Sequence, residues 1–152
     1  MPAQPPPPGV YVPVPTFFLP KSSSSYNSIS SPLDPEAQAA HSIHLAASGI
    51  RGLVILGSTG EAVHLSNTER NSVIRDAKKS LAEAGYTDYP IIAGTATQNI
   101  EECVMQLKES KEAGAQWGLV LVPGYFAGAV SQEGIVKWFE AVADASPIPI
   151  MV

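Results

Sequence analysis

The chain has 152 residues, of which 45% are apolar and 15% are charged, and its net charge is −5. This composition is typical of a globular protein, excludes overall disorder and fits a single domain. The acidic balance disfavours binding to nucleic acid or to an anionic membrane surface, and no apolar run approaches the roughly 20 residues of a membrane helix.

The N-terminus and the cysteine content bear on location. Residues 1–8 are rich in proline and contain no Lys or Arg, whereas secretory signals begin with basic residues and transit peptides are rich in arginine. Cys103 is the single cysteine, so an intrachain disulfide is impossible and a reducing compartment fits. We therefore expect a cytoplasmic protein, with Cys103 as a half-buried thiol on a helix.

The N-terminal residues predict one strand between two irregular segments. Residues 1–9 predict a flexible, polyproline-like lead-in. Residues 10–18 are apolar and β-branched, but they contain prolines, which cannot donate to a central ladder, so we expect a strand at the margin of a sheet. Residues 21–31 are rich in serine and predict a loop. The domain is expected to occupy residues 10–152.

From residue 34 onward, helix signals alternate with short apolar runs. Four helices are expected to begin after a capping residue, namely Asp34, Ser66, Asn99 and Ser131. Glycine should end the first three of them, near residues 48, 84 and 113. Between the helices, continuous apolar runs predict strands that are buried on both faces, at residues 52–56, 90–95 and 117–122, and residues 147–152 predict the start of a further strand.

This alternation predicts an α/β fold with a parallel sheet and right-handed crossovers. Periodicity alone leaves two architectures open, a (β/α)8 TIM barrel and an open doubly wound sheet. If the fold is a barrel, the expected strands and helices form its N-terminal half, truncated after about the fifth strand, because a full barrel needs about 250 residues.

In either architecture, a functional site lies at the carboxyl ends of the strands. The segment Gly57–Glu61 (Gly-Ser-Thr-Gly-Glu) follows the second predicted strand. Its glycines allow a tight turn and a close ligand, and its hydroxyls and free backbone N–H groups can hold a small carboxylate or phosphate. It matches neither a Walker P-loop nor a dinucleotide-binding fingerprint. A plain strand-to-helix turn is the alternative interpretation.

Two further strand ends carry polar candidates. Residues 94–99 follow the third predicted strand, and Tyr125 follows the fourth. A tyrosine hydroxyl at that position can relay a proton, or it can simply pack on the rim of the barrel. His41 and His44 lie three residues apart on the first helix without an evident Cys or carboxylate partner, so no metal site is expected.

The ordered motifs resemble the dihydrodipicolinate synthase / N-acetylneuraminate lyase family. The resemblance covers residues 9–152, and any one of its motifs is weak, whereas the whole series in order is specific. The motifs are Gly57–Glu61, Leu65-Ser66-x-x-Glu69-Arg70, Ile92–Thr95, Pro123-x-Tyr125 and Ser131–Gly134.

Membership of this family implies a class I, Schiff-base aldolase on a (β/α)8 barrel. The hydroxyl pair of the glycine turn binds the carboxylate of pyruvate or another 2-oxo acid, so Thr59 is implied to bind carboxylate, within a site that includes Gly57 and Gly60. Ser58 is implied to join a proton relay that Tyr125 completes, often across a dimer interface. No cofactor is expected, and the implied partners are a small 2-oxo acid and further copies of the chain, as a dimer or tetramer.

The segment 124–130 is longer than its counterpart in the family. This difference favours an aldolase for 2-keto-3-deoxy sugar acids or 4-hydroxy-2-oxoglutarate, with dihydrodipicolinate synthase as the alternative. In the family, a catalytic tyrosine follows the fifth strand and the Schiff-base lysine ends the sixth, whereas this sequence stops at Val152. Its lysines fall in predicted helices or in the Ser-rich loop: Lys21, Lys78, Lys79, Lys108, Lys111 and Lys137.

None of these lysines is expected to be a desolvated nucleophile of the kind that amine catalysis needs. We therefore expect a truncated aldolase that is inactive alone. A non-catalytic half-barrel that binds a full-length paralogue is the second hypothesis. The third is a small anion-binding α/β module, and it rests on the glycine turn alone.

Overall fold

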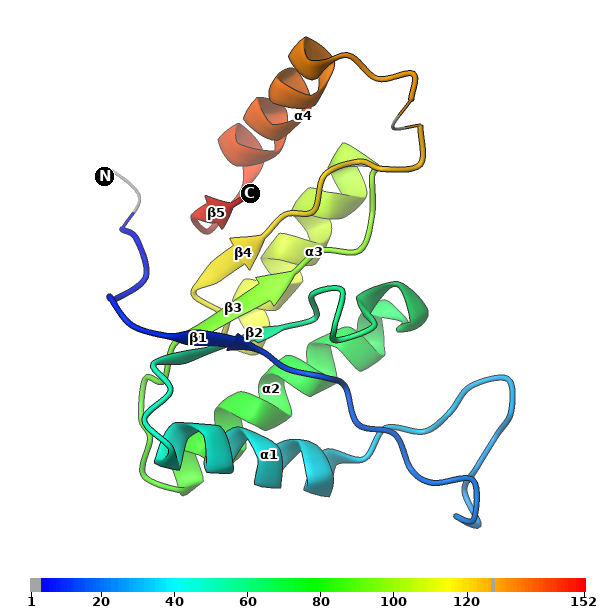
Figure 1. Ribbon diagram of the computed structural model, residues 1–152, viewed down its shortest axis with the longest axis vertical. Helices are drawn as coiled ribbons and strands as arrows, with labels where there is room; N and C mark the ends of the chain where they lie inside the picture. Colours follow the sequence, from blue (N-terminus) through cyan, green and yellow to red (C-terminus); the bar gives the residue numbers. More distant parts are fainter. Residues whose placement is uncertain (1–3, 127) are drawn as a thin grey trace.

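The structure, a computed structural model, describes residues 4–126 and 128–152. The first three residues of the predicted lead-in, and residue 127 within the segment 124–130, lie outside the described residues. Strands and helices alternate along the chain (Figure 1). The strands are β1 (Tyr11–Pro13), β2 (Gly52–Ile55), β3 (Ile91–Gly94), β4 (Trp117–Leu119) and β5 (Ile150–Met151). The helices are α1 (Pro35–Ala47), α2 (Asn67–Glu83), α3 (Ile100–Ala113) and α4 (Gln132–Ala145), with a 3-10 turn η1 (Ala62–His64).

The order of the strands in the sheet decides between the two architectures. The strands pair in parallel in the order β1-β2-β3-β4-β5, so each strand lies beside the next one along the chain. A doubly wound sheet reverses its strand order at a switch point, whereas a barrel adds strands in sequence with right-handed crossovers. The fold is therefore the N-terminal half of a (β/α)8 barrel.

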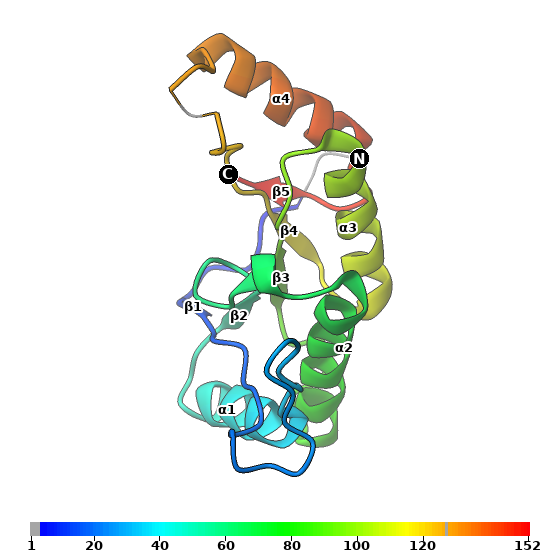
Figure 2. The same ribbon diagram turned by 90° about the vertical axis from the view of Figure 1, so that its right-hand side faces the viewer.

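Each helix packs against the one that follows it in the chain. In Figure 2, α2 and α3 stand along one side of the strands. As predicted, the helices begin at capping residues whose side chains accept a backbone N–H, namely Asp34, Ser66, Asn99 and Ser131. Ser66 and Glu69 complete the capping box. Gly114 caps α3 in the left-handed conformation that glycine adopts without strain.

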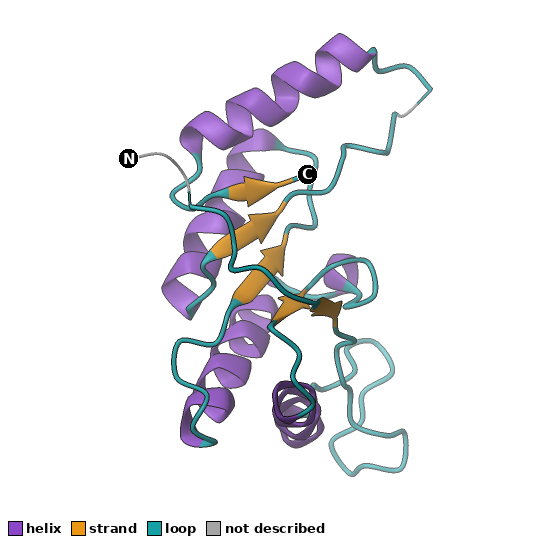
Figure 3. Cartoon of the chain, turned by 60° about the vertical axis from the view of Figure 1, so that its left-hand side comes forward, coloured by secondary structure: helices purple, strands orange, loops and turns teal. Residues whose placement is uncertain are grey.

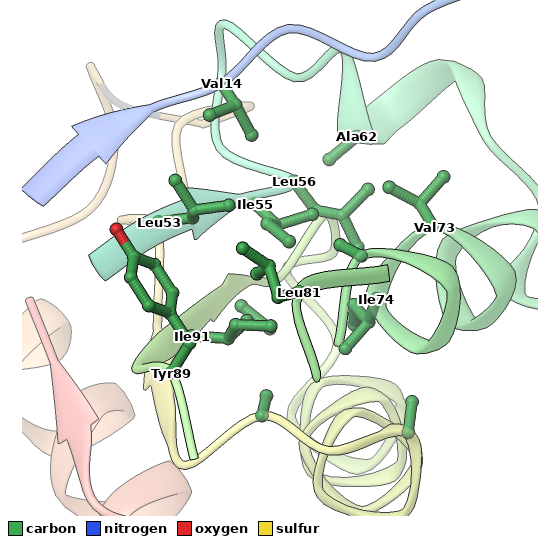
Figure 4. Close-up of a cluster of buried hydrophobic side chains, with 14 of the residues drawn as sticks. Val14, Leu53, Ile55, Leu56, Ala62, Val73, Ile74, Leu81, Tyr89 and Ile91 are labelled. Carbon is green, nitrogen blue, oxygen red and sulfur yellow. The ribbon is translucent and has the colours of Figure 1, made fainter. Parts of the chain in front are cut away.

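The main core lies between the sheet and the helices. Leu53 and Ile55 of β2 and Ile91 of β3 pack against the buried face of α2, which includes Ile74 and Leu81 (Figure 4). The same cluster continues to Val14, Leu56 and Ala62, which lie beyond the ends of the strands. The core therefore extends directly beneath the segment that follows β2.

Several expectations need correction. The predicted strands at 10–18, 117–122 and 147–152 are too long, because apolar sequence continues past the residues that share ladder hydrogen bonds. β1 does lie at the edge of this sheet, as its prolines predicted. Cys103 is fully buried rather than half-buried, because it faces Leu107 and Val142 inside a second apolar cluster.

The described part of the lead-in contacts the sheet. The carbonyl of Gln4 accepts a hydrogen bond from Trp117 Nε1 at 2.8 Å, and the carbonyl of Pro7 accepts one from the Tyr11 hydroxyl at 2.8 Å. Figure 3 shows this segment crossing the strands on its way to β1. Gln4 and Pro7 of the lead-in therefore have defined partners in β4 and β1.

Candidate functional site

The glycine turn, residues 57–61, leaves the carboxyl end of β2 and leads into η1. It is closed by two backbone hydrogen bonds, from Gly60 N–H to the carbonyl of Gly57 at 3.0 Å and from Glu61 N–H to the carbonyl of Ser58 at 3.2 Å. A parallel sheet brings the carboxyl ends of all its strands to one edge. The turn therefore lies at the edge where both candidate architectures place a site.

At the two ends of this turn, two residues other than glycine adopt the left-handed region. Leu56, which is buried, has a φ of 64°, and Glu61 has a φ of 52°. Each such residue costs about 1–2 kcal/mol relative to ordinary backbone. Conformations of this kind persist where the surroundings enforce them, and they cluster at functional sites.

Glycine is required at two positions around the turn. A Cβ at Gly94, the last residue of β3, would lie 2.0 Å from the carbonyl oxygen of Leu56. A Cβ at Gly60 would lie 2.9 Å from the backbone nitrogen of Leu56. The ends of β2 and β3 therefore touch through their backbones, and only glycine permits the approach.

The opposite side of the turn is open. Ser58 and Thr59 are both exposed, and although Gly57 itself is buried, a Cβ built on it would meet no atom within 4 Å among the described residues. Across residues 4–126 and 128–152, the backbone N–H groups of Ser58 and Thr59 donate to no backbone carbonyl. Hydroxyls and free N–H groups thus stand together at an accessible surface, which is the donor set that suits a small anion.

Tyr125 lies in the loop that follows β4, residues 120–131, which we call the tyrosine loop. Its side chain is 80% exposed and meets the ring of Phe126 edge to face at a centroid distance of 4.8 Å. Its backbone N–H donates to Gln98 Oε1 at 2.7 Å, so Gln98 ties the tyrosine loop to the exit of β3. The Trp138 indole also donates to the Gln98 carbonyl, at 2.9 Å.

Two cavities border the tyrosine loop. One of about 290 Å³ lies between this loop and the exit of β3, and its lining includes Val63, Thr95 and Tyr125. The other, of about 490 Å³, is mostly apolar and lies between Tyr125 and Phe126 on one side and Trp138 of α4 on the other. Neither cavity is lined by Ser58 or Thr59.

The structure thus brings some of the predicted site residues together and leaves one apart. A single turn contains Gly57, Ser58, Thr59 and Gly60. Val63, which lies in η1 just after this turn, lines the cavity beside Tyr125. Among the described residues, no hydrogen bond joins Ser58 to Tyr125. The relay between these two hydroxyls stays a prediction.

A model of the dihydrodipicolinate synthetase family matches residues 23–152. The chain belongs to this family. It is 40% identical to L-threo-3-deoxy-hexylosonate aldolase of Aspergillus niger over all of its length, which is 43% of that protein. It is 38% identical over 95% of its length to a protein of Emericella nidulans named "Probable 4-hydroxy-2-oxoglutarate aldolase, mitochondrial", of which it covers 44%.

Solved structures of the family share the fold. The chain matches a dihydrodipicolinate synthase family protein from Coccidioides immitis with a TM-score of 0.79 and 33% identity, over 95% of this chain and 43% of that one. It matches dihydrodipicolinate synthase from Acinetobacter baumannii, solved with pyruvate, with a TM-score of 0.77 and 27% identity, over 93% of this chain and 44% of that one. The chain therefore spans less than half the length of the relatives it matches.

The lysines of this family member lie on helices and loops, away from the glycine turn. Lys78 Nζ donates to the Tyr89 carbonyl just before β3, and Lys111 Nζ donates to the Pro147 carbonyl before β5, so both reach the amino ends of strands. Partial burial lowers the pKa of Lys78, which Asp88 partly opposes. Lys79 and Lys137 pair with glutamates one turn away, and Lys21 and Lys108 are exposed.

The histidines give no indication of a metal centre. The ring of His41 packs against Phe17 at a centroid distance of 5.2 Å, and His44 is exposed. His64 lines a separate cavity of about 340 Å³ with Glu61 and Glu69. Within the described part of the chain, no group of three or more His, Cys, Asp or Glu side chains is placed to hold a metal ion, and no helix is long and apolar enough to cross a membrane.

Sequence reasoning assigned no role to two residues that hold the turn. Thr16, which is buried beyond β1, donates its hydroxyl to the carbonyl of Gly60 at 2.6 Å. Arg70 on α2 is 2% exposed and donates to the carbonyls of Gly94 and Ala62. Arg70 had two detectable signals, because it ends the motif Leu65-Ser66-x-x-Glu69-Arg70 and falls on the apolar face of α2 that includes Val73. Thr16 had none, since its partner lies 44 residues away.

Proposed function

We propose that this chain forms the carboxylate-binding half of an aldolase site that acts on 2-oxo acids derived from pyruvate, of the 2-keto-3-deoxy sugar acid or 4-hydroxy-2-oxoglutarate type. One observation carries the proposal: the glycine turn presents exposed hydroxyls and free backbone N–H groups at the carboxyl edge of the sheet. The names of the similar proteins from Aspergillus niger and Emericella nidulans support the substrate class.

In this proposal the substrate carboxylate lies over Gly57, where the backbone leaves space. The Thr59 hydroxyl and the backbone N–H groups of the turn donate to the carboxylate oxygens, and hydrogen bonds to a charged acceptor are the stronger kind. Ser58 passes a proton toward the reacting carbonyl, and Tyr125 completes the relay. The Tyr125 side chain is exposed. The proposal therefore includes a homo-oligomer in which a neighbouring copy contacts the tyrosine loop and holds Tyr125 in place.

The covalent step of a class I aldolase needs a lysine amine that attacks the 2-oxo carbon and expels water, giving a protonated imine. Such a lysine must be desolvated or otherwise activated beside the carboxylate site. The lysines of this chain are exposed, paired with glutamate, or directed at the amino ends of strands. We therefore propose that these 152 residues bind the substrate carboxylate and do not form the imine alone.

The binding step is tested by titrating the chain with pyruvate in a calorimeter. Thr59→Val keeps the side-chain shape and removes one hydroxyl. Loss of a hydrogen bond to a charged group costs about 1.5–3 kcal/mol, so affinity should fall about 10-fold to 100-fold. Thr87→Val, at an exposed position before β3, is the matched control and should leave the affinity unchanged. Equal affinity of the wild type and Thr59→Val would refute the role of Thr59.

The covalent step is tested in the same samples by adding borohydride, which traps an imine as a stable amine. The mass of the chain should stay unchanged after treatment with pyruvate and borohydride. A mass increase that maps to any lysine of the chain would show that the chain carries its own nucleophile.

Dihydrodipicolinate synthase is the alternative activity within the same family. The chain is 38% identical to 4-hydroxy-tetrahydrodipicolinate synthase of Neisseria gonorrhoeae, but over only 68% of its length. Both activities use a 2-oxo acid, so pyruvate binding does not separate them. Substrate competition separates them when affinities are compared: under the first proposal a 2-keto-3-deoxy sugar acid should bind more tightly than pyruvate, whereas equal affinity would favour the alternative.

A non-catalytic half-barrel that binds a full-length paralogue is a second candidate, and the sheet favours it. β1 and β5 each pair with a single neighbour, so each leaves one edge without a ladder partner among the described residues. Unpaired edges of parallel strands promote association with another chain. Native mass measurement after mixing with a full-length relative separates the two candidates, since a heteromeric species is expected in the second one alone.

A further inference from the structure

Arg70 is a buried cation without a carboxylate partner. Its side chain is 2% exposed, and across residues 4–126 and 128–152 no Asp or Glu oxygen lies within 4.0 Å of its guanidinium. Taking a charge out of water costs several kcal/mol unless close partners compensate it. The apolar face of α2 would accept a large aliphatic residue at this position at no such cost. Packing alone therefore does not explain why an arginine occupies this position.

The two carboxylates whose charges act on Arg70 accept hydrogen bonds from other groups. Glu102 on α3 accepts from Asn67 Nδ2 at 3.0 Å, and Glu109 accepts from Asn71 Nδ2 at 3.0 Å. Burial lowers the pKa of Arg70, and the charges of Glu109 and Glu102 oppose that shift from a distance. These carboxylates support the charge of Arg70 without occupying its N–H donors.

The donors of Arg70 point instead at two loops on the carboxyl edge of the sheet. Nη2 donates to the carbonyl of Gly94 at 2.6 Å, and Nη1 donates to the carbonyl of Ala62 at 3.4 Å. Gly94 ends β3, whereas Ala62 begins η1 immediately after the glycine turn. One planar guanidinium therefore joins the end of β3 to the end of the turn, which a point-charge ammonium does less well.

The backbone that Arg70 joins is strained. Leu56 and Glu61, at the two ends of the turn, both have positive φ angles, and such conformations persist only where the surroundings over-determine them. Thr16 holds Gly60 from the side of β1. Arg70 holds the next part of the chain from the side of α2, and together they fix the turn from both directions.

We propose that Arg70 is a positioning residue, which holds the glycine turn and the exit of β3 in the geometry that presents Thr59 and the free N–H groups to a carboxylate. This inference rests on the proposed function for the identity of the ligand. The clamp itself rests on the two hydrogen bonds and on the burial of Arg70.

The test compares three variants of the full chain. Arg70→Ala removes the clamp, Arg70→Lys keeps the charge without the planar fork, and Arg75→Met removes an exposed cation from the same helix as the matched control. Pyruvate affinity is measured by calorimetry, the melting temperature by calorimetric scanning, and the mobility of the turn by amide hydrogen exchange.

Arg70→Ala should weaken pyruvate binding on the order of tenfold to 100-fold, because a displaced turn loses hydrogen bonds to the carboxylate and each such bond to a charged group has an effect of about that size. Hydrogen exchange should rise in residues 57–65 and 94–96 and stay unchanged in the second half of α2. Guanidinium ion at millimolar concentration should restore part of the affinity by refilling the site. Arg70→Lys should lie between Arg70→Ala and the wild type.

Three outcomes would overturn the inference. One is unchanged pyruvate affinity in Arg70→Ala. Another is faster exchange spread equally over α2 and the turn, which would mark a purely structural role. The third is an affinity loss in Arg75→Met as large as in Arg70→Ala. If Arg70→Ala does not fold, Arg70→Lys supplies the affinity and exchange data alone.

The hydrogen-exchange result does not depend on the ligand. If the wild-type chain binds no pyruvate, the proposed function fails, while the exchange pattern of Arg70→Ala still decides whether the clamp exists. A normal exchange pattern in Arg70→Ala together with pyruvate binding by the wild type would reject the clamp and leave the proposed function intact.

Discussion

The glycine turn after β2 and the tyrosine loop after β4 leave the same edge of the sheet but are held very differently. The turn stands on buried Leu56, and it is anchored by Thr16 and Arg70 from two other elements. The tyrosine loop is tied to the rest of the chain by Gln98, and its two aromatic side chains project into solvent.

This difference separates the part of the proposed site that the described residues organise from the part that they do not. The turn has its support within residues 11–94, so the carboxylate-binding part of the proposed site is already organised. The tyrosine loop exposes Tyr125 at 80% and Phe126 at 65% beside an apolar cavity. Exposed aromatic groups of this kind mark contact surfaces, so among the described residues the position of Tyr125 is not fixed in the way that the turn is.

The largest expected effect compares the apolar side chain beneath the turn with one within the tyrosine loop. Leu56→Ala removes a fully buried side chain beneath the turn and should lower the free energy of unfolding by about 2–5 kcal/mol. Phe126→Ala removes a side chain that is 65% exposed and should change it by less than about 0.5 kcal/mol. Urea denaturation of both variants measures the contrast. Equal destabilisation would show that the tyrosine loop is as well supported as the turn.

A smaller effect is expected from the hydroxyl that anchors the turn. Thr16→Val leaves the buried carbonyl of Gly60 without its donor, and an unsatisfied buried group costs about 1–3 kcal/mol. The midpoint of urea unfolding should fall accordingly, with exposed Thr87→Val as the control for the same chemical change. If Thr16→Val unfolds at the wild-type midpoint, the turn does not depend on the element that follows β1.

The sequence predicted the helices and strands of this fold better than the long-range contacts that hold them together. Helix starts followed from local chemistry, because Ser66 and Glu69 need only each other to form a capping box. Strand ends were placed too far along the chain, since an apolar run such as 117–122 does not reveal where the neighbouring strand diverges. The choice of a barrel required the strand order, which is a property of long-range pairing.

In the candidate site, too, features set by local sequence were predicted and features set by long-range contacts were not. The position of the glycine turn was readable from Gly57–Glu61 alone. The left-handed conformations of Leu56 and Glu61 were not, because glycine and asparagine are the residues that usually predict positive φ. The contact between Arg70 and Gly94 spans 24 residues of sequence, and no local pattern encodes it. Tyr125 was placed correctly after β4, whereas its role in a proton relay stays a prediction.

The smallest effect is also the one that separates stability from binding. Glu61 is exposed and has a φ of 52°, so its backbone is strained while its side chain contributes little burial. Glu61→Gly removes this strain, and it should raise the free energy of unfolding by up to about 1 kcal/mol. The same change frees the exit of the turn and should weaken pyruvate binding, since the donors of Ser58 and Thr59 lose their fixed geometry.

Glu61→Ala is the matched control for this last change, because it removes the carboxylate and keeps the strain. If both variants weaken binding equally, the carboxylate of Glu61 is responsible and the backbone is not. If Glu61→Gly alone gains stability and loses affinity, the strain at the end of the turn is part of the binding site. The tyrosine loop offers no equivalent variant, since among the described residues its positions carry no positive φ.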